Sequence, residues 1–285
     1  MGAGPRKTIR LAAKSVDRTS REYEKNYRRI RKHGDEKSIH LLRVSTRRLL
    51  AMMDLFNGHI PASISKKARK RAKGIFAGLG PLRDLQIQIQ LLPSLTPETD
   101  DIEPFYAELR AEAEILAGAQ FQKLPPKVPG SIRKTVRALV DFLETTKENG
   151  DGTALGLELH HKVDTAFRKV RQLASRADPS KPETIHALRI AFKRFRYMAE
   201  FLAPLTPSIN RETLDRYRWF QQTMGDIQDI CGLEGRLSRF TATRPVKSRK
   251  PYASALNEVR QERDARIQKL MKAMPEIPLL WEAGP

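Results

Sequence analysis

Two stretches of the sequence repeat one pattern of histidine, arginine and lysine. They start at Ile39 and Ile185, and both read I-H-x-L-R-[VI]-x-x-[RK]-R-[LF]. On an α-helix of about 3.6 residues per turn, residues three or seven positions apart lie on the same face. The spacing predicts one cationic row on each helix: His40, Arg43 and Arg47 on the first, and His186, Arg189, Lys193 and Arg196 on the second. Such rows can bind phosphate, because guanidinium groups donate paired hydrogen bonds and ammonium groups act as point charges.

The opposite face of each helix is apolar. It carries Leu42, Leu49, Met53 and Phe56 on the first helix, and Leu188, Phe195 and Leu202 on the second. A helix of this kind packs its apolar face on a core and leaves its basic face exposed. We expect no acidic residue four positions after a basic residue of the row, so that no ion pair within the helix neutralises the basic face. This face could be a solvated surface, but its repetition at equivalent positions of both helices, beside a histidine, favours anion binding.

The composition favours an anionic partner. Among 285 residues, 53 Lys and Arg stand against 33 Asp and Glu, which gives a formal net charge of +20. Such a surplus favours polyanions or an anionic membrane surface. No stretch approaches the roughly 20 apolar residues of a membrane span. Arg6, Lys7 and Arg10 interrupt any apolar signal segment, and the single Cys231 can form no internal disulfide. We therefore expect a cytoplasmic protein.

The periodicity of apolar residues predicts an all-α protein. We expect a first helix over residues 6–32 that ends at Gly34, and a second that begins with Ser38 as N-cap and stops near Asn57. A third helix should run from Ser63 or Ser65 to Leu92, with a kink at Pro81. The remaining predicted helices are 104–122, 131–148, one that carries Leu159 and Val163, one that carries the second strip, 211–240 and 252–273.

The second half of the chain resembles the first. The segment 149–152 reads N-G-D-G and marks the expected boundary, so we assign 1–150 to one helical half and 151–285 to the other. The fold expected is a tandem repeat of a four-helix unit, packed as two pseudo-symmetric helical bundles. The two cationic rows could then face one basic central groove. Like charges brought together cost free energy, so such a groove suggests a frequent anionic occupant.

These motifs resemble the CHAD family, the conserved histidine α-helical domain. The resemblance rests on the two strips and on two further segments, Leu79-Gly80-x-Leu82-Arg83-Asp84 and Met224-Gly225-x-Ile227-Gln228-Asp229. The four motifs occur in the expected order, and the match covers about 6–273 as one domain. The sequence departs from a strict repeat at Lys193, which stands where the first strip has Arg47, and at Gln228, which stands where the first half has Arg83.

The resemblance implies a function as well as a fold. Members of this family are all-helical, with two bundles around a basic central groove, and they bind inorganic polyphosphate at polyphosphate granules. They often accompany CYTH-type triphosphate tunnel phosphatases, fused or as neighbours. The sequence lacks the E-x-E-x-K signature of such a phosphatase. A catalytic partner, if there is one, is therefore expected to be another polypeptide.

The predicted polyphosphate site extends beyond the two rows. Its members are His40, Arg43, Arg47, Arg48, His186, Arg189, Lys193, Arg194 and Arg196, extended by Lys66, Lys70, Lys73, Arg10, Lys14, Arg21, Lys25, Arg168 and Arg218. The basic cluster of residues 66–73 could equally be a solubilising or nucleic-acid patch. Each histidine could be a core or capping residue, although an imidazole at a helix start can donate to a phosphoryl oxygen. A metal site is the weaker interpretation, because the neighbours of the histidines are cations. We expect no metal and no cofactor.

Three functions remain open. The first is non-enzymatic polyphosphate binding, with Asp84 and Asp229 as structural supports that hold an arginine by a salt link. The second is general DNA or RNA binding, for which Tyr197 is the aromatic candidate near the basic row. The third is an enzyme that cleaves or transfers phosphate, but the chain offers no P-loop and no paired carboxylates on one face. Polyphosphate binding without catalysis is the favoured hypothesis.

Overall fold

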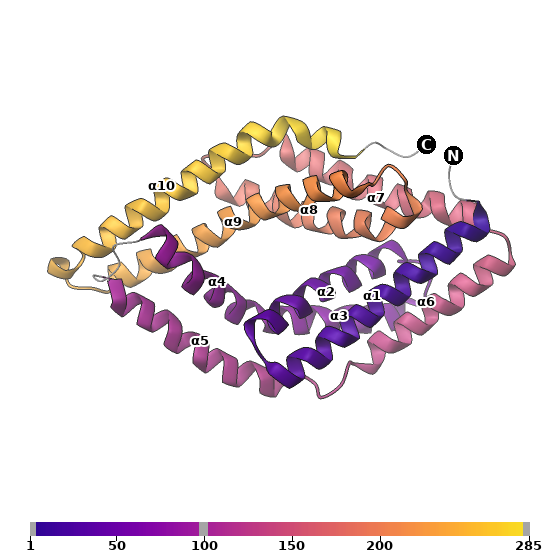
Figure 1. Ribbon diagram of the computed structural model, residues 1–285, viewed down its shortest axis with the longest axis horizontal. Helices are drawn as coiled ribbons and strands as arrows, with labels where there is room; N and C mark the ends of the chain where they lie inside the picture. The colour runs from indigo at the N-terminus through magenta and orange to yellow at the C-terminus, as the bar shows by residue number, and fades with distance from the viewer. Residues whose placement is uncertain (1–3, 97–101, 282–285) are drawn as a thin grey trace.

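The computed structural model describes residues 4–96 and 102–281, which are almost entirely helical (Figure 1). The described residues contain no β-strand, so the all-α prediction is confirmed. Short 3₁₀ helices cover Ala203–Leu205, Val246–Ser248 and Met274–Leu280. The α-helices are α1 (Pro5–His33), α2 (Glu36–Leu55), α3 (Ala62–Gly78), α4 (Gly80–Leu95), α5 (Glu103–Lys123), α6 (Gly130–Glu148), α7 (Gly152–Ala174), α8 (Pro182–Leu202), α9 (Arg211–Ala242) and α10 (Lys250–Ala273).

Two of the expected helix boundaries need correction. The N-cap of α2 is Asp35, whose side chain accepts the backbone N–H of Ser38 at 2.8 Å, so Ser38 lies inside the first turn. The predicted third helix is two helices, divided at Leu79. Pro81 does not kink a continuous helix, because it occupies the first turn of α4, where its missing N–H leaves no bond unmade. As expected, Gly34 ends α1, in the left-handed conformation with φ of 62°.

The helices that carry the two strips lie at the centre of the molecule. The basic strip helices α2 and α8 pack against each other, with α1 beside α2 and α7 beside α8 (Figure 1). The helices that carry the L-G-x-L-R-D and M-G-x-I-Q-D motifs, α4 and α9, also pack against each other. Four helices that are distant in the sequence therefore meet around one region.

Most of the core is one cluster that draws residues from both predicted halves. It includes the predicted apolar backs of the strip helices, with Leu42, Leu49, Leu188 and Phe195 fully buried. A second cluster joins α4 and α5 to the far ends of α9 and α10 through residues such as Phe105 and Phe240. The division at residue 150 stays a prediction, since the main core crosses it. No helix in the described ranges combines the length and the apolar character that crossing a bilayer demands.

Candidate anion-binding cleft

Two cavities, of about 470 and 800 Å³, lie between α2, α4, α8 and α9. His186 lines the first cavity and His40 lines the second, so we call them the His186 side and the His40 side. Both cavities are lined by one set of residues, which we call the waist: Arg43, Arg47, Asp84, Ile87, Arg189, Tyr197 and Asp229. The two cavities are therefore two sides of one central cleft.

Phe76 of α3 positions the two arginines that α2 contributes to the waist. Arg43 donates from Nη1 to the carbonyl oxygen of Phe76 at 2.9 Å. Its guanidinium carbon lies 4.2 Å from the centroid of the Phe76 ring, and that of Arg47 lies 4.8 Å from it. Both cations thus stand over one aromatic face, which favours positive charge. The ring holds the two guanidinium groups together without neutralising them.

The glycines of the two shorter motifs leave room for the arginines of the strips. A Cβ added at Gly80 would lie 3.4 Å from Nη1 of Arg43, and one added at Gly225 would lie 4.0 Å from Nε of Arg189. Each glycine therefore faces the equivalent arginine of its own half. An added Cβ would make an ordinary van der Waals contact with the guanidinium, and a longer side chain would occupy space beside it. The two glycines thus leave the arginines room toward α4 and α9, although glycine within a helix costs stability.

Four basic side chains in the cleft have no anionic partner. We call Arg43, Arg47, Arg189 and Lys193 the inner cations; in the part of the chain that the structure describes, none of them forms an ion pair. The Nε of Arg189 is buried and makes no hydrogen bond. An unsatisfied buried donor next to uncompensated charge is costly in an empty cleft. An anion placed between these groups would remove that cost.

Burial and neighbouring cations lower the pKa of Arg43, Arg189 and Lys193. Burial, together with Arg47 and Arg189, lowers the pKa of Lys193 to about 6, against the opposing effect of Asp229. Burial also lowers the pKa of Arg189. The pKa of Arg43 falls to about 10 through burial and the neighbouring Arg47, so this guanidinium stays charged at neutral pH. The empty cleft therefore favours an uncharged Lys193 at neutral pH, while its arginines remain charged.

The two histidines lie on opposite sides of the waist. His186 contacts the side-chain oxygen of Gln228 through Nδ1, on the side of the cleft that bears its name. His40 keeps an exposed edge, and partial burial beside Arg83 and Arg47 lowers its pKa. Both imidazoles border the cleft, as the rows predicted, but they do not share one cavity. Any ligand that meets both must pass the waist.

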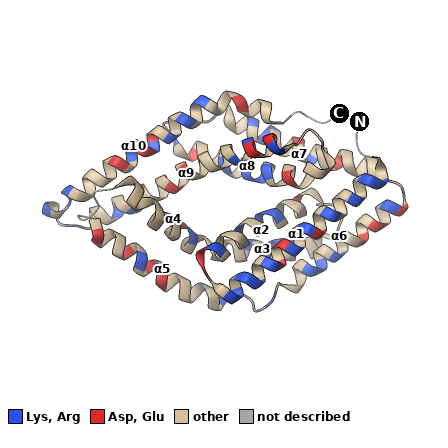
Figure 2. Ribbon diagram, viewed as in Figure 1, with Lys and Arg blue, Asp and Glu red and all other residues tan. Residues whose placement is uncertain are grey.

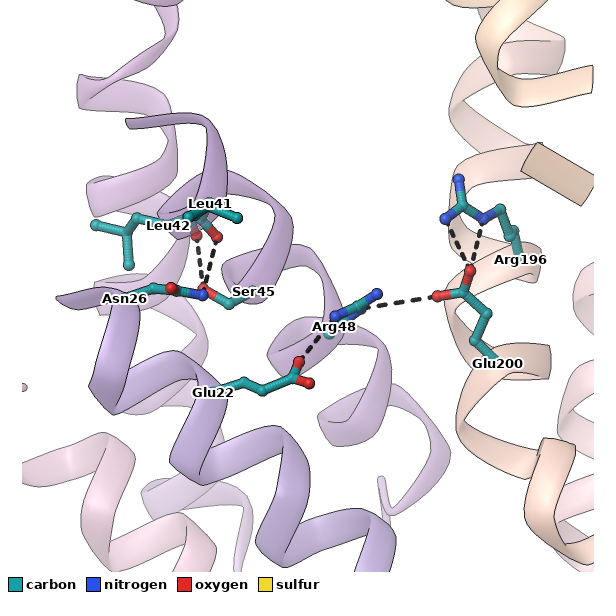
Figure 3. A network of polar contacts seen from close by, with 8 residues as sticks. All are labelled: Glu22, Asn26, Leu41, Leu42, Ser45, Arg48, Arg196 and Glu200. Carbon is teal, nitrogen blue, oxygen red and sulfur yellow. Dashed lines mark hydrogen bonds and ion pairs between the residues drawn. The ribbon is translucent and has the colours of Figure 1, made fainter. Parts of the chain in front are cut away.

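Three arginines of the strips are neutralised by ion pairs, two of which, Arg48 and Arg196, are shown in Figure 3. We call Arg48, Arg194 and Arg196 the paired arginines. Arg48 of α2 contacts Glu22 of α1 at 2.8 Å and Glu200 of α8 at 3.7 Å, and Arg196 contacts the same Glu200 at 2.7 Å. The expectation that no acidic residue follows the row at the fourth position is therefore wrong at Arg196. Arg196 is 8% exposed, so its charge serves this buried pair.

The ion pairs between the strip helices are reciprocal. Arg194 of α8 pairs with Asp54 of α2 at 2.8 Å, and Arg69 of α3 contacts the same carboxylate. When the two strips are aligned, Arg48 corresponds to Arg194 and Asp54 corresponds to Glu200. Each strip helix thus offers one arginine and one carboxylate to the equivalent groups of the other. This is the pattern expected when two equivalent surfaces meet across a twofold axis; the pseudo-symmetry of the two halves as a whole stays a prediction.

Asp84 and Asp229 line both sides of the cleft but hold no arginine. Among the described residues neither carboxylate makes an ion pair or a hydrogen bond, so the predicted salt link is absent. Arg83, the neighbour of Asp84, pairs instead with Glu36. Asp84 is exposed, whereas burial raises the pKa of Asp229. Both groups are therefore acidic members of an otherwise cationic waist.

The predicted extension of the site lies outside the cleft, apart from Arg218. This arginine lines the His40 side and pairs with Asp215. Lys70 borders a separate groove of about 750 Å³ between α3 and α5. The remaining members are exposed and line neither side of the cleft: Lys66, Lys73, Arg10, Lys14, Arg21, Lys25 and Arg168. Basic residues occur on every helix from α1 to α10 (Figure 2), so charge alone does not mark the site.

Several residues of the cleft were not found from the sequence. Phe76, Asp54 and Glu200 carry no motif of their own, and their roles depend on helices that meet only in the fold. Tyr197, the expected stacking candidate, is 4% exposed. Trp219 is the aromatic residue that borders the His40 side, where it is 39% exposed. In the sequence Trp219 directly follows the basic Arg218, and this could have indicated an aromatic residue beside a basic surface.

The geometry of the cleft suits the binding of an anion. Within residues 4–96 and 102–281, no three His, Cys, Asp or Glu side chains gather in a way that could hold a metal ion. The inner cations instead offer several N–H donors toward one space. Such a site can accept phosphoryl or carboxylate oxygens by hydrogen bonding and charge.

A family model described as the CHAD domain matches residues 14–238 of the chain. No curated protein matches the chain. Among solved structures, the crystal structure of the CHAD domain from the plant Ricinus communis is similar, with a TM-score of 0.67 and 20% sequence identity. The similarity covers 99% of this chain and 94% of that one, and at this identity it shows a shared fold.

Proposed function

The chain belongs to the CHAD domain family, and from this membership and the geometry of the central cleft we propose that it is a non-enzymatic binding protein for inorganic polyphosphate. The polymer lies in the cleft and passes the waist. Its phosphoryl oxygens accept hydrogen bonds from Arg43, Arg47 and Arg189, while Lys193 supplies a point charge. The two histidines meet the chain on opposite sides of the waist.

The observation that carries the proposal is the absence of ion pairs around the inner cations, among the residues described. Elsewhere in the same two helices, arginines meet a glutamate or an aspartate. Holding the charged Arg43, Arg47 and Arg189 together in a partly buried cleft, and charging Lys193 beside them, costs free energy that a bound anion recovers. A polyanion fits better than a single phosphate, because cationic groups continue on both sides of the waist.

Binding by many weak charge contacts has a recognisable dependence on salt. Each phosphoryl group that meets a cation releases a condensed counterion, so affinity should fall steeply as salt increases. The exposed cations of the predicted extension, such as Lys70 and Arg10, could contact a long chain where it leaves the cleft. They should add to the affinity for long chains and contribute little for short ones.

We further propose that the protein acts without turnover of its ligand, in the cytoplasm and at polyphosphate granules. The partners that the family resemblance suggests are granule proteins and a CYTH-type triphosphate tunnel phosphatase on another polypeptide. Asp84 and Asp229 stand among cations in a cleft for which we expect no metal, so they lack the metal cage that phosphoryl transfer requires. Incubation of the pure protein with polyphosphate, with and without magnesium, should release no orthophosphate.

General binding of DNA or RNA is the alternative. One observation favours it: the exposed Trp219 borders the His40 side of the cleft, where a base could stack on it. Of the other aromatic residues that line the cleft, Tyr197 is buried, and the ring of Phe76 is covered by Arg43 and Arg47. A single exposed ring is a small stacking platform for a polymer of many bases.

A competition assay tests the proposal against this alternative. Labelled long-chain polyphosphate is bound to the protein at near-physiological salt. Tripolyphosphate, duplex DNA and single-stranded RNA are then added at equal phosphate concentration. We expect unlabelled long polyphosphate to displace the label at far lower concentration than either nucleic acid. Equal competition by DNA or RNA would make the cleft a general polyanion surface and favour the alternative.

A further inference from the structure

Two carboxylates stand where an anionic ligand would be expected to meet cations. Asp84 of α4 and Asp229 of α9 occupy equivalent positions, at the ends of the L-G-x-L-R-D and M-G-x-I-Q-D motifs. Both belong to the waist, so each faces both sides of the cleft. Neither forms an ion pair or a hydrogen bond with another described residue. They therefore do not fix the geometry of an arginine, and another role is needed.

Their charge acts on the inner cations through space. Asp229 influences the titration of both Arg189 and Lys193, and Asp84 influences that of Arg43 and Arg189. In the empty cleft, two negative charges among these cations offset part of the repulsion. Both side chains are attached to helices that pack in the core, so their carboxylates stay close to the waist when an anion enters. An anion at the waist gains the attraction of the cations and meets the repulsion of the carboxylates.

We propose that Asp84 and Asp229 are built-in competitors that make the cleft selective for long polyanions. This inference rests on the proposed function and concerns the same cleft. A short anion confined to the waist meets the carboxylates at every position it can occupy. A long chain meets them once and continues beyond the waist, toward Lys193 on the His186 side and toward His40 on the other side. The penalty is thus a large share of the binding energy of a short chain and a small share of that of a long one.

Charge removal at constant shape tests this role. The double variant D84N/D229N keeps the size of both side chains and removes both negative charges. Affinity for tripolyphosphate should rise by about tenfold or more, and affinity for chains of about one hundred phosphates by a smaller factor, about threefold. The ratio of the two affinities should therefore fall. Both are measured by fluorescence anisotropy at one near-physiological salt concentration.

Glu212 provides a control on the same helix. It is exposed on α9, lines neither side of the cleft, and forms no ion pair with another described residue. Glu212→Gln removes a negative charge outside the cleft, so the ratio of long-chain to short-chain affinity should stay close to that of the wild type. The single variant Asp84→Asn covers the case in which the double variant fails to fold, because Asp84 is exposed and makes no contact that folding needs.

The outcomes separate this inference from the function on which it rests. A larger gain for the short chain in D84N/D229N, or in D84N alone, supports the competitor role. Unchanged or weaker binding, or an equal gain for both chains, would overturn it while the proposed function stands. Wild-type protein that binds neither chain would contradict the proposed function itself. Weaker binding with a lower melting temperature would instead make the carboxylates stabilisers of the empty cleft, which also overturns the competitor role.

Discussion

The inner cations and the paired arginines are the same kinds of residue on the same two helices, yet they have opposite surroundings. Arg48, Arg194 and Arg196 meet Glu22, Asp54 or Glu200. The inner cations meet an aromatic ring, two glycines and each other. The difference teaches that the basic charge of a strip helix divides into two functions. One part joins α1, α2 and α8, and the other part remains available to a ligand.

The largest effect on binding is expected from charge reversal among the inner cations. In R43E/R189E, two donors become two carboxylates at the waist, and we expect affinity for polyphosphate to fall by about a hundredfold or more. Helix content should not change, because both side chains point into the cleft. Circular dichroism and anisotropy titration measure the two effects. The control R10E/R168E makes the same change of charge at exposed positions outside the cleft; an equal loss there would contradict the special role of the inner cations.

Lower pH should strengthen binding through Lys193. Its amine is faced by Arg43 and Arg47 from α2, by Arg189 from its own helix and by Asp229 from α9, and its pKa in the empty cleft is about 6. A bound polyanion favours the charged amine and raises that pKa, so above about pH 6 binding takes up a proton. The dissociation constant should therefore increase between about pH 6 and 8, by at most about tenfold per pH unit for one proton.

The variant Lys193→Arg isolates this effect from any contribution of other groups in the cleft. An arginine stays charged throughout, so the pH dependence of binding should become flatter than in the wild type. Titrations at pH 6, 7 and 8 in one ionic strength give both profiles. Identical profiles for the two proteins would assign the pH dependence to His40 and His186 instead.

The variant Phe76→Leu removes the aromatic ring that lies against Arg43 and Arg47. Leucine keeps an apolar side chain but offers no aromatic face to Arg43 and Arg47. Each cation–π contact contributes about 0.5–2 kcal/mol, so we expect affinity to fall by about three- to tenfold. Anisotropy titration measures the loss, and a melting curve checks the fold. Affinity equal to that of the wild type would mean that the backbone carbonyl of residue 76 is sufficient to place Arg43.

The smallest effect on binding is expected for a paired arginine. Arg194→Gln breaks the contact with Asp54 but leaves the inner cations in place, so affinity should change by less than about threefold. Its cost should appear as stability, by about 1 kcal/mol, because the pair is partly exposed. Urea unfolding measures this loss of stability. A large loss of affinity without loss of stability would mean that Arg194 binds the ligand.

The sequence was informative where a local period decides the outcome. The 3.6-residue spacing placed Arg43, Arg47 and Arg189 on one face and the buried Leu42 and Leu188 on the other, and the structure has both arrangements. The division of basic residues into free and paired could not be predicted in this way. It depends on which carboxylates neighbouring helices bring close, and Glu22 and Asp54 reach Arg48 and Arg194 only after α1, α2 and α8 have packed.

The break at Leu79 and the place of Asp84 show the same limit. A proline in a helical pattern is compatible with a kink or with a new first turn, and packing of α3 and α4 selects the second. The motif residue Asp84 was expected to hold an arginine, because a carboxylate beside a basic row usually does. Its arginine neighbour turns to Glu36 instead, and this choice is made by the contact between α2 and α4.

The most direct test of the account compares the salt dependence of binding for two double variants that are matched in charge. R43Q/R189Q removes two inner cations, and R48Q/R194Q removes two paired arginines with the same change in net charge. Affinity for long polyphosphate is measured between about 50 and 300 mM salt, where the slope counts the cations that meet phosphoryl groups. We predict that R43Q/R189Q loses at least about tenfold in affinity and has a shallower slope, while R48Q/R194Q stays within about threefold of the wild type with its slope unchanged. Equal losses and equal slopes in the two variants would contradict the division between free and paired arginines.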